Sequence, residues 1–371
     1  MRIVIFGLSI TSSWGNGHAT TFRALARALH DRGHRIVFYE RDVEWYASNR
    51  DMPEPPFCEV RLYSDWNEIR KSAISETNSA DVVMVGSYCP DGLAIIEELG
   101  DSCVPVKTFY DIDTPITVSQ LREIGRTDYL RADQLPIFDI YFSFTGGPML
   151  REIESFGARV AVPLYCSFDP AEYRRFGVNK RFACDLSYMG TYAPDRQEKI
   201  DQLLCEPARQ LATRKFIVAG PQYPKSIKWP ENVRRITHLN PRWHGRFYSS
   251  SRLTLNVTRR DMVRAGYSPS VRLFEAAACG ATIISDNWPG LETFFTPGEQ
   301  ILLPTNSEDV VHILRDTTPE ELDRIGAQAQ ERVLAEHTSA KRAAEFERHV
   351  AEISRPKAVE ESTPTLSSAS F

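Results

Sequence analysis

The sequence is poor in cysteine and has no long apolar run. Its seven cysteines are odd in number, scattered and never spaced as C-x-x-C, which argues against a disulfide framework or a zinc site and favours a reduced setting. No segment reaches the roughly 18 apolar residues of a membrane span, and the starting run IVIFGL is too short for a signal peptide. We therefore expect a soluble, cytoplasmic protein, with peripheral membrane contact left open.

An excess of positive charge is also missing. The formal net charge is -5 at pH 7, which argues against general nucleic-acid binding but leaves room for a local basic pocket. Hydrophobic residues make up 42% and charged residues 25% of the chain, as in ordinary globular proteins. A length of 371 residues suffices for two domains, each with its own core.

The first part of the chain alternates apolar strands with amphipathic helices. A buried strand is expected over residues 3–8, a helix over 19–31 and a second strand over 35–40. This order predicts parallel strands joined by a right-handed crossover. Further strands are expected over 81–87, 107–112, 139–144 and 159–164.

The loop SITSSWGNGH follows the first strand and differs from a G-x-G-x-x-G dinucleotide fingerprint. Glycines such as Gly17 let the backbone approach a ligand closely, and Asn16 lies beside it. His18 falls in the first helical turn, at the carboxyl ends of the strands, where open α/β sheets bind ligands. Its alternative role is helix capping or packing.

Two later strands are each followed by polar or small residues. Asp111 and Asp113 come after the strand in FYDID, and Gly146 follows the next one in SFTGGP. Carboxylates at a strand end suit acid–base work or the binding of substrate hydroxyls. Turn capping before Thr114 is the alternative.

A second strand–helix series begins after an aperiodic, basic stretch. We expect an N-terminal domain over 1–165, a linker over 166–183 and a C-terminal domain over 184–335. A C-terminal helix is expected over 336–353, and a polar, disordered tail over 354–371. The strands of the second domain are expected over 186–192, 215–220, 233–239, 253–259, 281–286 and 300–304.

Residues 266–290, GYSPSVRLFEAAACGATIISDNWPG, predict a helix starting at Ser268-Pro269 and followed by a buried strand. Ser270 and Arg272 lie near the helix start, which favours an anion such as phosphate. Glu275 lies roughly 7–10 Å further along the axis, about the separation of a diphosphate from its ribose hydroxyls. The alternative is a plain capped helix with a surface pair between Arg272 and Glu275.

The segment SVRLFEAAACGATIISDNWPGLETFFTPGEQILL resembles the nucleotide-sugar half of GT-B glycosyltransferases. The resemblance extends to MGTYAPDR, LTLNVTRRDM, PLYCSFDPAEY, FYDIDTPIT and the N-terminal loop, and covers about residues 1–340. It is strongest for the CgeB-like group, distantly related to the retaining family-four enzymes. The resemblance implies a GT-B architecture: two Rossmann-like α/β domains facing one another across a cleft.

The resemblance also implies a donor site in the C-terminal domain, with Glu275 on the ribose hydroxyls. Tyr267 stands where the first glutamate of an E-x7-E pair is expected, so the contact to the donor sugar must differ. The remaining donor-site candidates are Gly190 and Thr191 under the phosphates, Arg196, Arg259, Ser270 and Arg272 around the diphosphate, and His238 and Leu239 beside the base.

These features predict a glycosyltransferase that uses a nucleoside diphosphate sugar, with UDP favoured, and neither a metal ion nor a cofactor. Kinship favours retention of configuration; if the reaction inverts, His18 or Asp113 must serve as base. The acceptor hydroxyl belongs to a saccharide, a lipid-linked glycan or a natural product. A nucleotide-sugar 2-epimerase and a non-catalytic sugar-nucleotide-binding protein are the alternatives.

Overall fold

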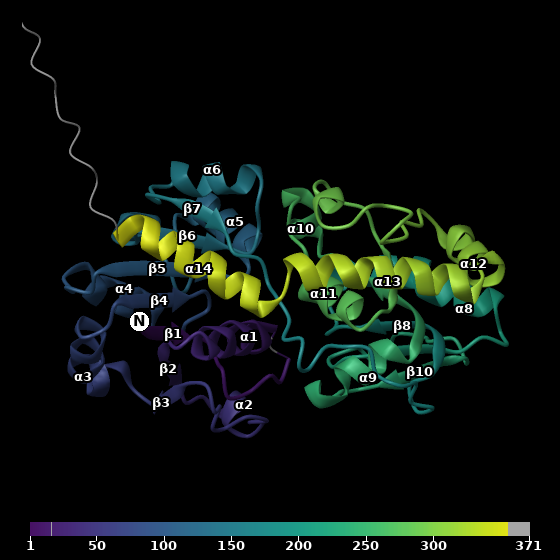
Figure 1. Cartoon of the computed structure of the whole chain (residues 1–371), viewed down its shortest axis with the longest axis horizontal. Helices are drawn as coiled ribbons and strands as arrows, with labels where there is room; N and C mark the ends of the chain where they lie inside the picture. The colour runs from purple at the N-terminus through teal and green to yellow at the C-terminus, as the bar shows by residue number, and fades with distance from the viewer. Residues whose placement is uncertain (16, 355–371) are drawn as a thin grey trace, which may run out of the picture.

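The computed structural model describes residues 1–15 and 17–354 and places two α/β domains side by side (Figure 1). Within this part of the chain, the N-terminal domain has a seven-stranded sheet in the order β3-β2-β1-β4-β5-β6-β7. Every pairing in it is parallel. The strands are β1 (Arg2–Gly7), β2 (Arg35–Arg41), β3 (Glu59–Tyr63), β4 (Val82–Gly86), β5 (Val106–Asp111), β6 (Ile140–Ser143) and β7 (Ala161–Pro163).

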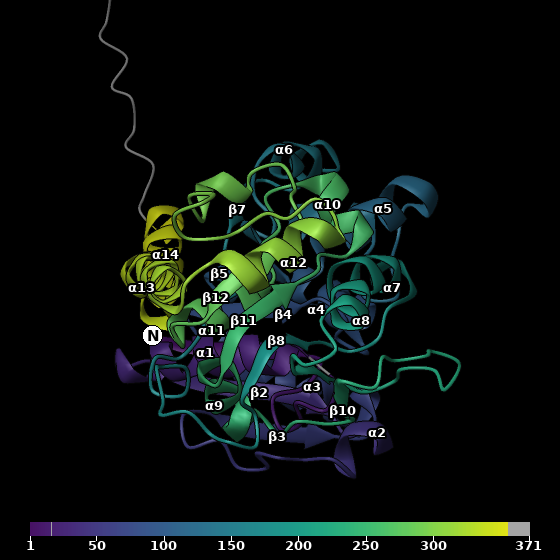
Figure 2. The ribbon, with the colours of Figure 1, turned by 90° about the vertical axis from the view of Figure 1, so that its right-hand side faces the viewer.

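The C-terminal domain has a five-stranded parallel sheet in the order β10-β9-β8-β11-β12, seen in Figure 2. Its strands are β8 (Cys184–Met189), β9 (Phe216–Ala219), β10 (Val233–Ile236), β11 (Ser251–Asn256) and β12 (Thr282–Ser285). In both domains, parallel strands direct their carboxyl ends to one edge of the sheet, where ligand-binding loops gather.

Helices cover both faces of each sheet. The N-terminal domain contributes α1 (Gly17–Asp31), α2 (Glu44–Ala47), α3 (Trp66–Asn78), α4 (Gly92–Gly100), α5 (Thr114–Ile124) and α6 (Pro148–Ser155). The helices of the C-terminal domain are α7 (Pro194–Ile200), α8 (Glu206–Gln210), α9 (His244–Ser249), α10 (Arg260–Ala265), α11 (Val271–Ala278) and α12 (Ser307–Asp316). Two C-terminal helices follow, α13 (Pro319–Glu336) and α14 (Ser339–Ser354).

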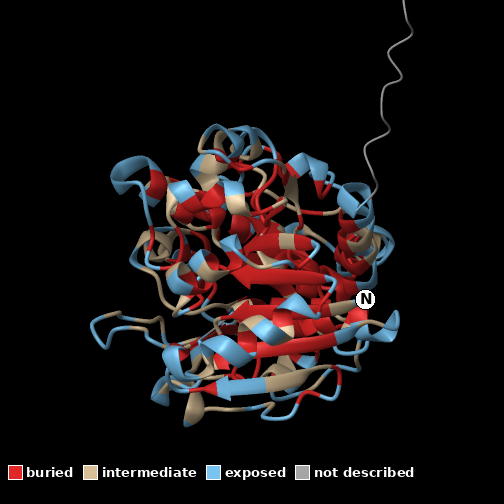
Figure 3. Ribbon diagram, turned by 90° about the vertical axis from the view of Figure 1, so that its left-hand side faces the viewer, coloured by how far each residue is buried: buried red, intermediate tan, exposed pale blue. Residues whose placement is uncertain are grey.

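Strand β1 shows how the apolar sequence builds the core. Because side chains alternate along a strand, Ile3 and Ile5 pack on one face of the sheet and Val4 and Phe6 on the other. All four are fully buried, and Figure 3 shows the central strands covered on both sides. A continuous apolar run is the expected signature of such a two-sided parallel sheet.

Helix α13 packs on the C-terminal domain, whereas α14 returns to the N-terminal domain and lies beside α1 (Figure 1). Phe346 of α14 is fully buried and its ring lies 5.3 Å from that of Phe142 on β6. Arg342 is also buried, and its Nε donates to the carbonyl of Tyr165 at 3.0 Å. The chain therefore crosses between the domains twice.

Three expectations about elements need correction. The predicted strand over 300–304 is absent from the described structure, where Leu302 makes only an isolated bridge to Ile284. The short α2 was not expected. The edge strand β3 was not expected either, because it lacks an apolar run. The helix starts at Val271 with Ser270 as its N-cap, two residues later than expected.

The tail expected over 354–371 lies outside the described residues, apart from Ser354, which ends α14. Within the described chain, no helix combines the length and the apolar character that a membrane crossing requires.

Candidate active site

Two adjoining cavities lie between the domains. The central cavity has a volume of about 410 Å³ and the lateral cavity about 260 Å³. Both are lined by Gly15, Gly17, Arg196, Ser270 and Val271, so they meet at the start of α11. The other predicted residues that line the central cavity are His18, Asp113 and Arg259. Those that line the lateral cavity are Gly190, Thr191, His238, Leu239, Arg272 and Glu275.

Helix α11 presents its N-terminus at the junction of the cavities. The Ser270 hydroxyl accepts from the backbone N–H of Arg272 at 3.3 Å, which caps the helix. The remaining unpaired amides and the helix dipole make this junction favourable for an anion. Arg272 and Glu275 are only 9% and 5% exposed, so the alternative of a surface pair is wrong.

Arg272 holds the ends of two strands together. Its Nε donates to the carbonyl of Met189 on β8, and one Nη donates to Oδ1 of Asn256 on β11 at 2.8 Å. The guanidinium also lies over the Tyr188 ring, 5.1 Å from its centroid. Arg272 therefore positions the loop after β8 and adds positive charge behind it.

The loop after β8 has little room for a side chain at position 190. A Cβ there would lie 2.7 Å from the Tyr188 hydroxyl and 2.9 Å from Nη2 of Arg272. The next residue, Thr191, is fixed from α7, because Arg196 donates to its carbonyl at 2.6 Å. The backbone thus runs close to the lateral cavity with no side chain in the way.

Glu275 lines the lateral cavity and is almost fully buried. Burial raises the pKa of its carboxyl group to about 7, and a hydrogen bond from Tyr173 opposes the rise. Tyr173 also pairs with Nδ1 of His244 at 3.2 Å, and the other ring nitrogen of His244 lies 3.0 Å from the carbonyl of Leu239. This chain links the carboxylate to the segment containing His238 and Leu239.

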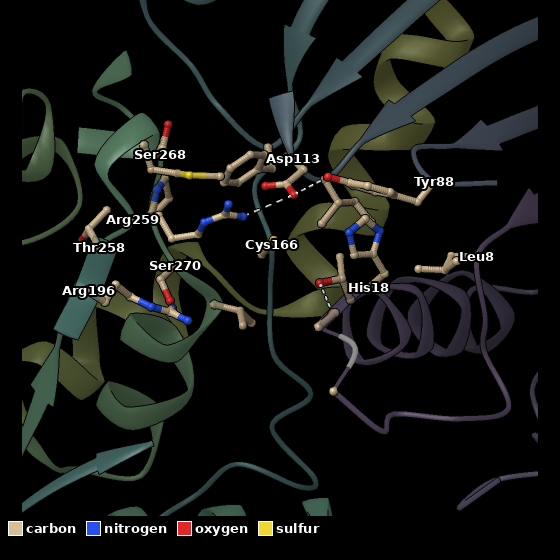
Figure 4. A pocket seen from close by; sticks show the side chains of 18 of the residues that line it. Leu8, His18, Tyr88, Asp113, Cys166, Arg196, Thr258, Arg259, Ser268 and Ser270 are labelled. Carbon is tan, nitrogen blue, oxygen red and sulfur yellow. Dashed lines mark hydrogen bonds and ion pairs between the residues drawn. The ribbon is translucent and has the colours of Figure 1, made fainter. Parts of the chain in front are cut away.

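The central cavity brings together side chains from both domains (Figure 4). Asp113 accepts a hydrogen bond from the Tyr88 hydroxyl at 3.0 Å and lies 3.7 Å from Nη1 of Arg259. Burial raises the pKa of Asp113, while Arg259 and Tyr88 act against that rise. Burial lowers the pKa of His18 to about 4, so its imidazole is neutral at pH 7 and can accept a hydrogen bond from a hydroxyl group.

Asp111 lies behind the central cavity and does not line it. It is fully buried, accepts from the Tyr141 hydroxyl at 2.5 Å and accepts from the backbone N–H of Asp113 at 3.0 Å. These bonds fix the turn that carries Asp113. Asp111 therefore does not contact a ligand in the central cavity, contrary to expectation, because its side chain points inward from the strand end.

Gly146 and Tyr267 also lie outside both cavities and instead join the domains. The Gly146 N–H donates to the Tyr267 carbonyl at 3.0 Å, and the hydroxyls of Thr145 and Ser268 lie 2.9 Å apart. The Tyr267 backbone has a positive φ of 47°, and its ring lies against Gly147 of the other domain and lines neither cavity. The expected donor contact of Tyr267 is therefore corrected to an interdomain contact. The predicted Asn16 lies outside the described residues.

Tyr88 was not among the predicted residues, although it lines the central cavity. It follows β4 in the same way that Asp113 follows β5, so the strand-end argument applied to GSYCP would have found it. Within residues 1–15 and 17–354, no group of three or more His, Cys, Asp or Glu side chains is arranged to hold a metal ion.

Comparison with known proteins gives a sequence match for the C-terminal part of the chain. Residues 196–348 match a sequence family described as "Glycosyl transferase-like". No curated protein sequence matches the chain significantly.

Solved structures show the same fold over nearly the whole chain. HepE from Anabaena, in complex with UDP and glucose, has 11% sequence identity and a TM-score of 0.68, with 95% of this chain and 100% of that chain covered. Sucrose-phosphate synthase from Thermosynechococcus elongatus has 13% identity and a TM-score of 0.67, covering 95% and 99%. An alpha-glucosyltransferase in complex with UDP has 13% identity and a TM-score of 0.69, covering 95% and 100%.

The fold is thus the GT-B fold, as expected from the sequence. The family match falls on the part of the chain that holds most of the lateral cavity. Together they define the class of protein that this chain resembles: glycosyltransferases of the GT-B fold.

Proposed function

We propose that the protein transfers a sugar from a nucleoside diphosphate sugar, with UDP favoured, to a hydroxyl group of an acceptor. The observation that carries this proposal is the meeting of the two cavities at the N-terminus of α11. The diphosphate binds at this junction, the nucleoside occupies the lateral cavity, and the sugar and acceptor occupy the central cavity. The UDP complexes of proteins with the same fold support the choice of donor.

In this arrangement Glu275 accepts hydrogen bonds from the ribose hydroxyls. The segment containing His238 and Leu239 lies beside the base, and the backbone at Gly190 and Thr191 approaches the phosphates. A buried carboxylate in the wall of a cavity binds hydroxyl donors strongly, because water does not compete for it.

The chemistry requires stabilisation of the departing diphosphate. Arg196, Arg259 and the amides at the start of α11 place positive charge where that negative charge develops. The two domains hold donor and acceptor in one enclosed space, which supplies proximity and orientation. We propose that no metal ion takes part and that no further cofactor is needed.

We further propose that the reaction retains the anomeric configuration. The acceptor hydroxyl then attacks on the face from which the diphosphate leaves, and its proton passes to the departing phosphate oxygen. In this reaction His18 and Asp113 orient the acceptor hydroxyl and need not form a covalent bond. The quoted motifs support placement in the CgeB-like group, and the seven unpaired cysteines support a cytoplasmic location.

A calorimetric titration with UDP tests the donor site. The wild type is expected to bind UDP, and Glu275→Ala to bind it about 10- to 100-fold more weakly, as expected for loss of hydrogen bonds to a charged group. Glu308→Ala, at an exposed position of α12, is the matched control and should leave the affinity unchanged. Absence of UDP binding by the wild type would reject the proposal.

A screen of UDP-sugars against saccharide, lipid-linked and natural-product acceptors then tests transfer. The anomeric configuration of any product, read by NMR, decides between retention and inversion. Conversion of the donor into its C2 epimer would identify an epimerase instead. Binding of donor without transfer to any acceptor would identify a non-catalytic sugar-nucleotide-binding protein.

A further inference from the structure

Arg259 and Asp113 face one another across the central cavity from different domains (Figure 4). Arg259 is the residue before α10, and Asp113 is the residue before α5. Their 3.7 Å separation makes an ion pair but exceeds the usual length of a hydrogen bond. The Nε of Arg259 has no hydrogen-bond partner among the described residues. A single loose contact therefore holds this guanidinium, which is 40% exposed.

Asp113, in contrast, is supported from its own domain. The Tyr88 hydroxyl donates to its carboxylate at 3.0 Å, and its backbone N–H donates to Asp111 at 3.0 Å. Tyr88 packs edge-on against His18, with ring centroids 5.3 Å apart. Its φ of 60° is unusual for a residue other than glycine, and such strain is kept where the surrounding structure enforces it. These contacts remain if Arg259 moves.

We propose that Asp113 competes with the donor diphosphate for Arg259, and that Tyr88 is the positioning residue that keeps Asp113 directed into the cavity when Arg259 moves to the diphosphate. The inference rests on the proposed function and deepens it. The competition predicts that the donor binds before the acceptor. The Asp113 carboxylate becomes free to bind an acceptor hydroxyl only after the diphosphate has bound Arg259.

The exchange is favourable because the two anions bind a guanidinium differently. A diphosphate offers several oxygens that can accept two parallel N–H bonds, whereas Asp113 offers one long contact. The amides at the start of α11 and the side chain of Arg196 line the same cavity and hold the diphosphate in place. Arg259 needs only to rotate within the cavity that it already lines.

A double-mutant cycle on UDP affinity tests the competition. Asp113→Asn removes the competing carboxylate, so UDP should bind about two- to fivefold more tightly, as expected for loss of a long, partly exposed ion pair. In an Arg259→Met background, the same substitution should leave the affinity unchanged. If Asp113→Asn tightens binding equally in both backgrounds, simple repulsion of the phosphates explains the effect and the inference is overturned.

These outcomes separate the inference from the proposed function. A wild type that does not bind UDP rejects the proposed function, and the inference with it. If the wild type binds UDP but the effects of the two substitutions on its affinity are additive, only the inference about Asp113 and Arg259 is rejected. Melting temperatures of the four proteins in the cycle show whether each is folded.

The role of Tyr88 is tested by proton uptake on UDP binding, measured calorimetrically in buffers of different ionisation enthalpy. Loss of Arg259 should raise the pKa of Asp113, which Arg259 and Tyr88 lower and Asp261 raises. The wild type should therefore take up protons at mildly acidic pH. The Asp113→Asn variant measures the background proton uptake. This background comes from UDP itself, from His18, which lines the cavity, and from Asp111, which lies behind it.

In Tyr88→Phe the pH of maximal uptake should move upward, because the hydrogen bond that favours the charged carboxylate is gone. An unshifted profile in a folded Tyr88→Phe variant would overturn the positioning role.

Discussion

The ring of Tyr267 lies so close to Gly147 that a Cβ at position 147 would come 2.3 Å from Cδ2 of that ring. The two residues belong to different domains, and the neighbouring Gly146 donates its N–H to the Tyr267 carbonyl. Gly290 bounds the same ring from the C-terminal domain, since a Cβ there would lie 2.5 Å from Cδ1. The domain contact therefore depends on two positions without side chains.

Gly147→Ala is expected to weaken this contact, and Gly125→Ala is its matched control. Both glycines have positive φ, but a Cβ at position 125 meets no atom within 4 Å. Gly125 lies in the left-handed region (φ 74°, ψ 2°), so the control should lose about 1 kcal/mol of unfolding free energy from backbone strain. Gly147 (φ 63°, ψ -144°) lies in a region that side chains adopt at higher cost, so Gly147→Ala should lose about 1–3 kcal/mol more through this strain and through overpacking against Tyr267. Urea unfolding measures the loss of unfolding free energy in both variants. Equal losses would show that the Tyr267 ring does not restrict position 147.

The sequence predicted most of the elements that carry the site. The apolar runs of β1, β4, β5 and β6 and the helix α1 were expected at nearly their observed positions, because burial on both faces leaves a strong signal. The edge strand β3 was missed because its side chains are partly exposed, so its pattern resembles a loop. The run 300–304 is apolar, yet it makes only two isolated bridges, at Ile301 and Leu302, since pairing is decided by tertiary contacts.

Prediction of the site was limited by side-chain direction. Asp111 and Asp113 are equally polar in sequence, but one points into the domain and the other into the cavity. Tyr267 occupies the position of an expected carboxylate, and only the contact of its ring with Gly147 shows that it faces the other domain. Spacing along a chain places residues near a site without settling which way they point.

Phe346→Ala is expected to detach α14 from the N-terminal domain. The ring is fully buried, and truncation of such a residue costs about 3–5 kcal/mol. Leu334→Ala on α13 is the control, since Leu334 is 43% exposed and should cost about 0.5 kcal/mol or less. Urea denaturation of the two variants gives the comparison. A loss for Phe346→Ala no larger than that of the control would show that α14 contributes little to the fold.

Glu275 makes stability depend on pH. Its pKa rises from the ordinary 4.5 to about 7 in the folded protein, so the folded state binds more protons than the unfolded state between these values. The unfolding free energy should therefore fall as pH rises from about 4.5 to 7, by roughly 3 kcal/mol at 1.36 kcal/mol per unit. Glu275→Gln keeps the shape and should lose this dependence. Parallel pH profiles of urea unfolding for the two proteins would contradict the assignment.

Trp14 provides a spectroscopic test of the lateral cavity. Its ring, in the loop after β1, lies 4.2 Å from the ring of His238 in the other domain. Its neighbours Ser13 and Gly15 line the lateral cavity, so a nucleotide bound there should change the surroundings of the indole. UDP is therefore expected to alter the tryptophan emission of the wild type, and Trp14→Phe should lose most of that change. Trp45→Phe is the control, because Trp45 is 55% exposed and lines neither cavity. An emission change that survives in Trp14→Phe and disappears in Trp45→Phe would place the nucleotide elsewhere.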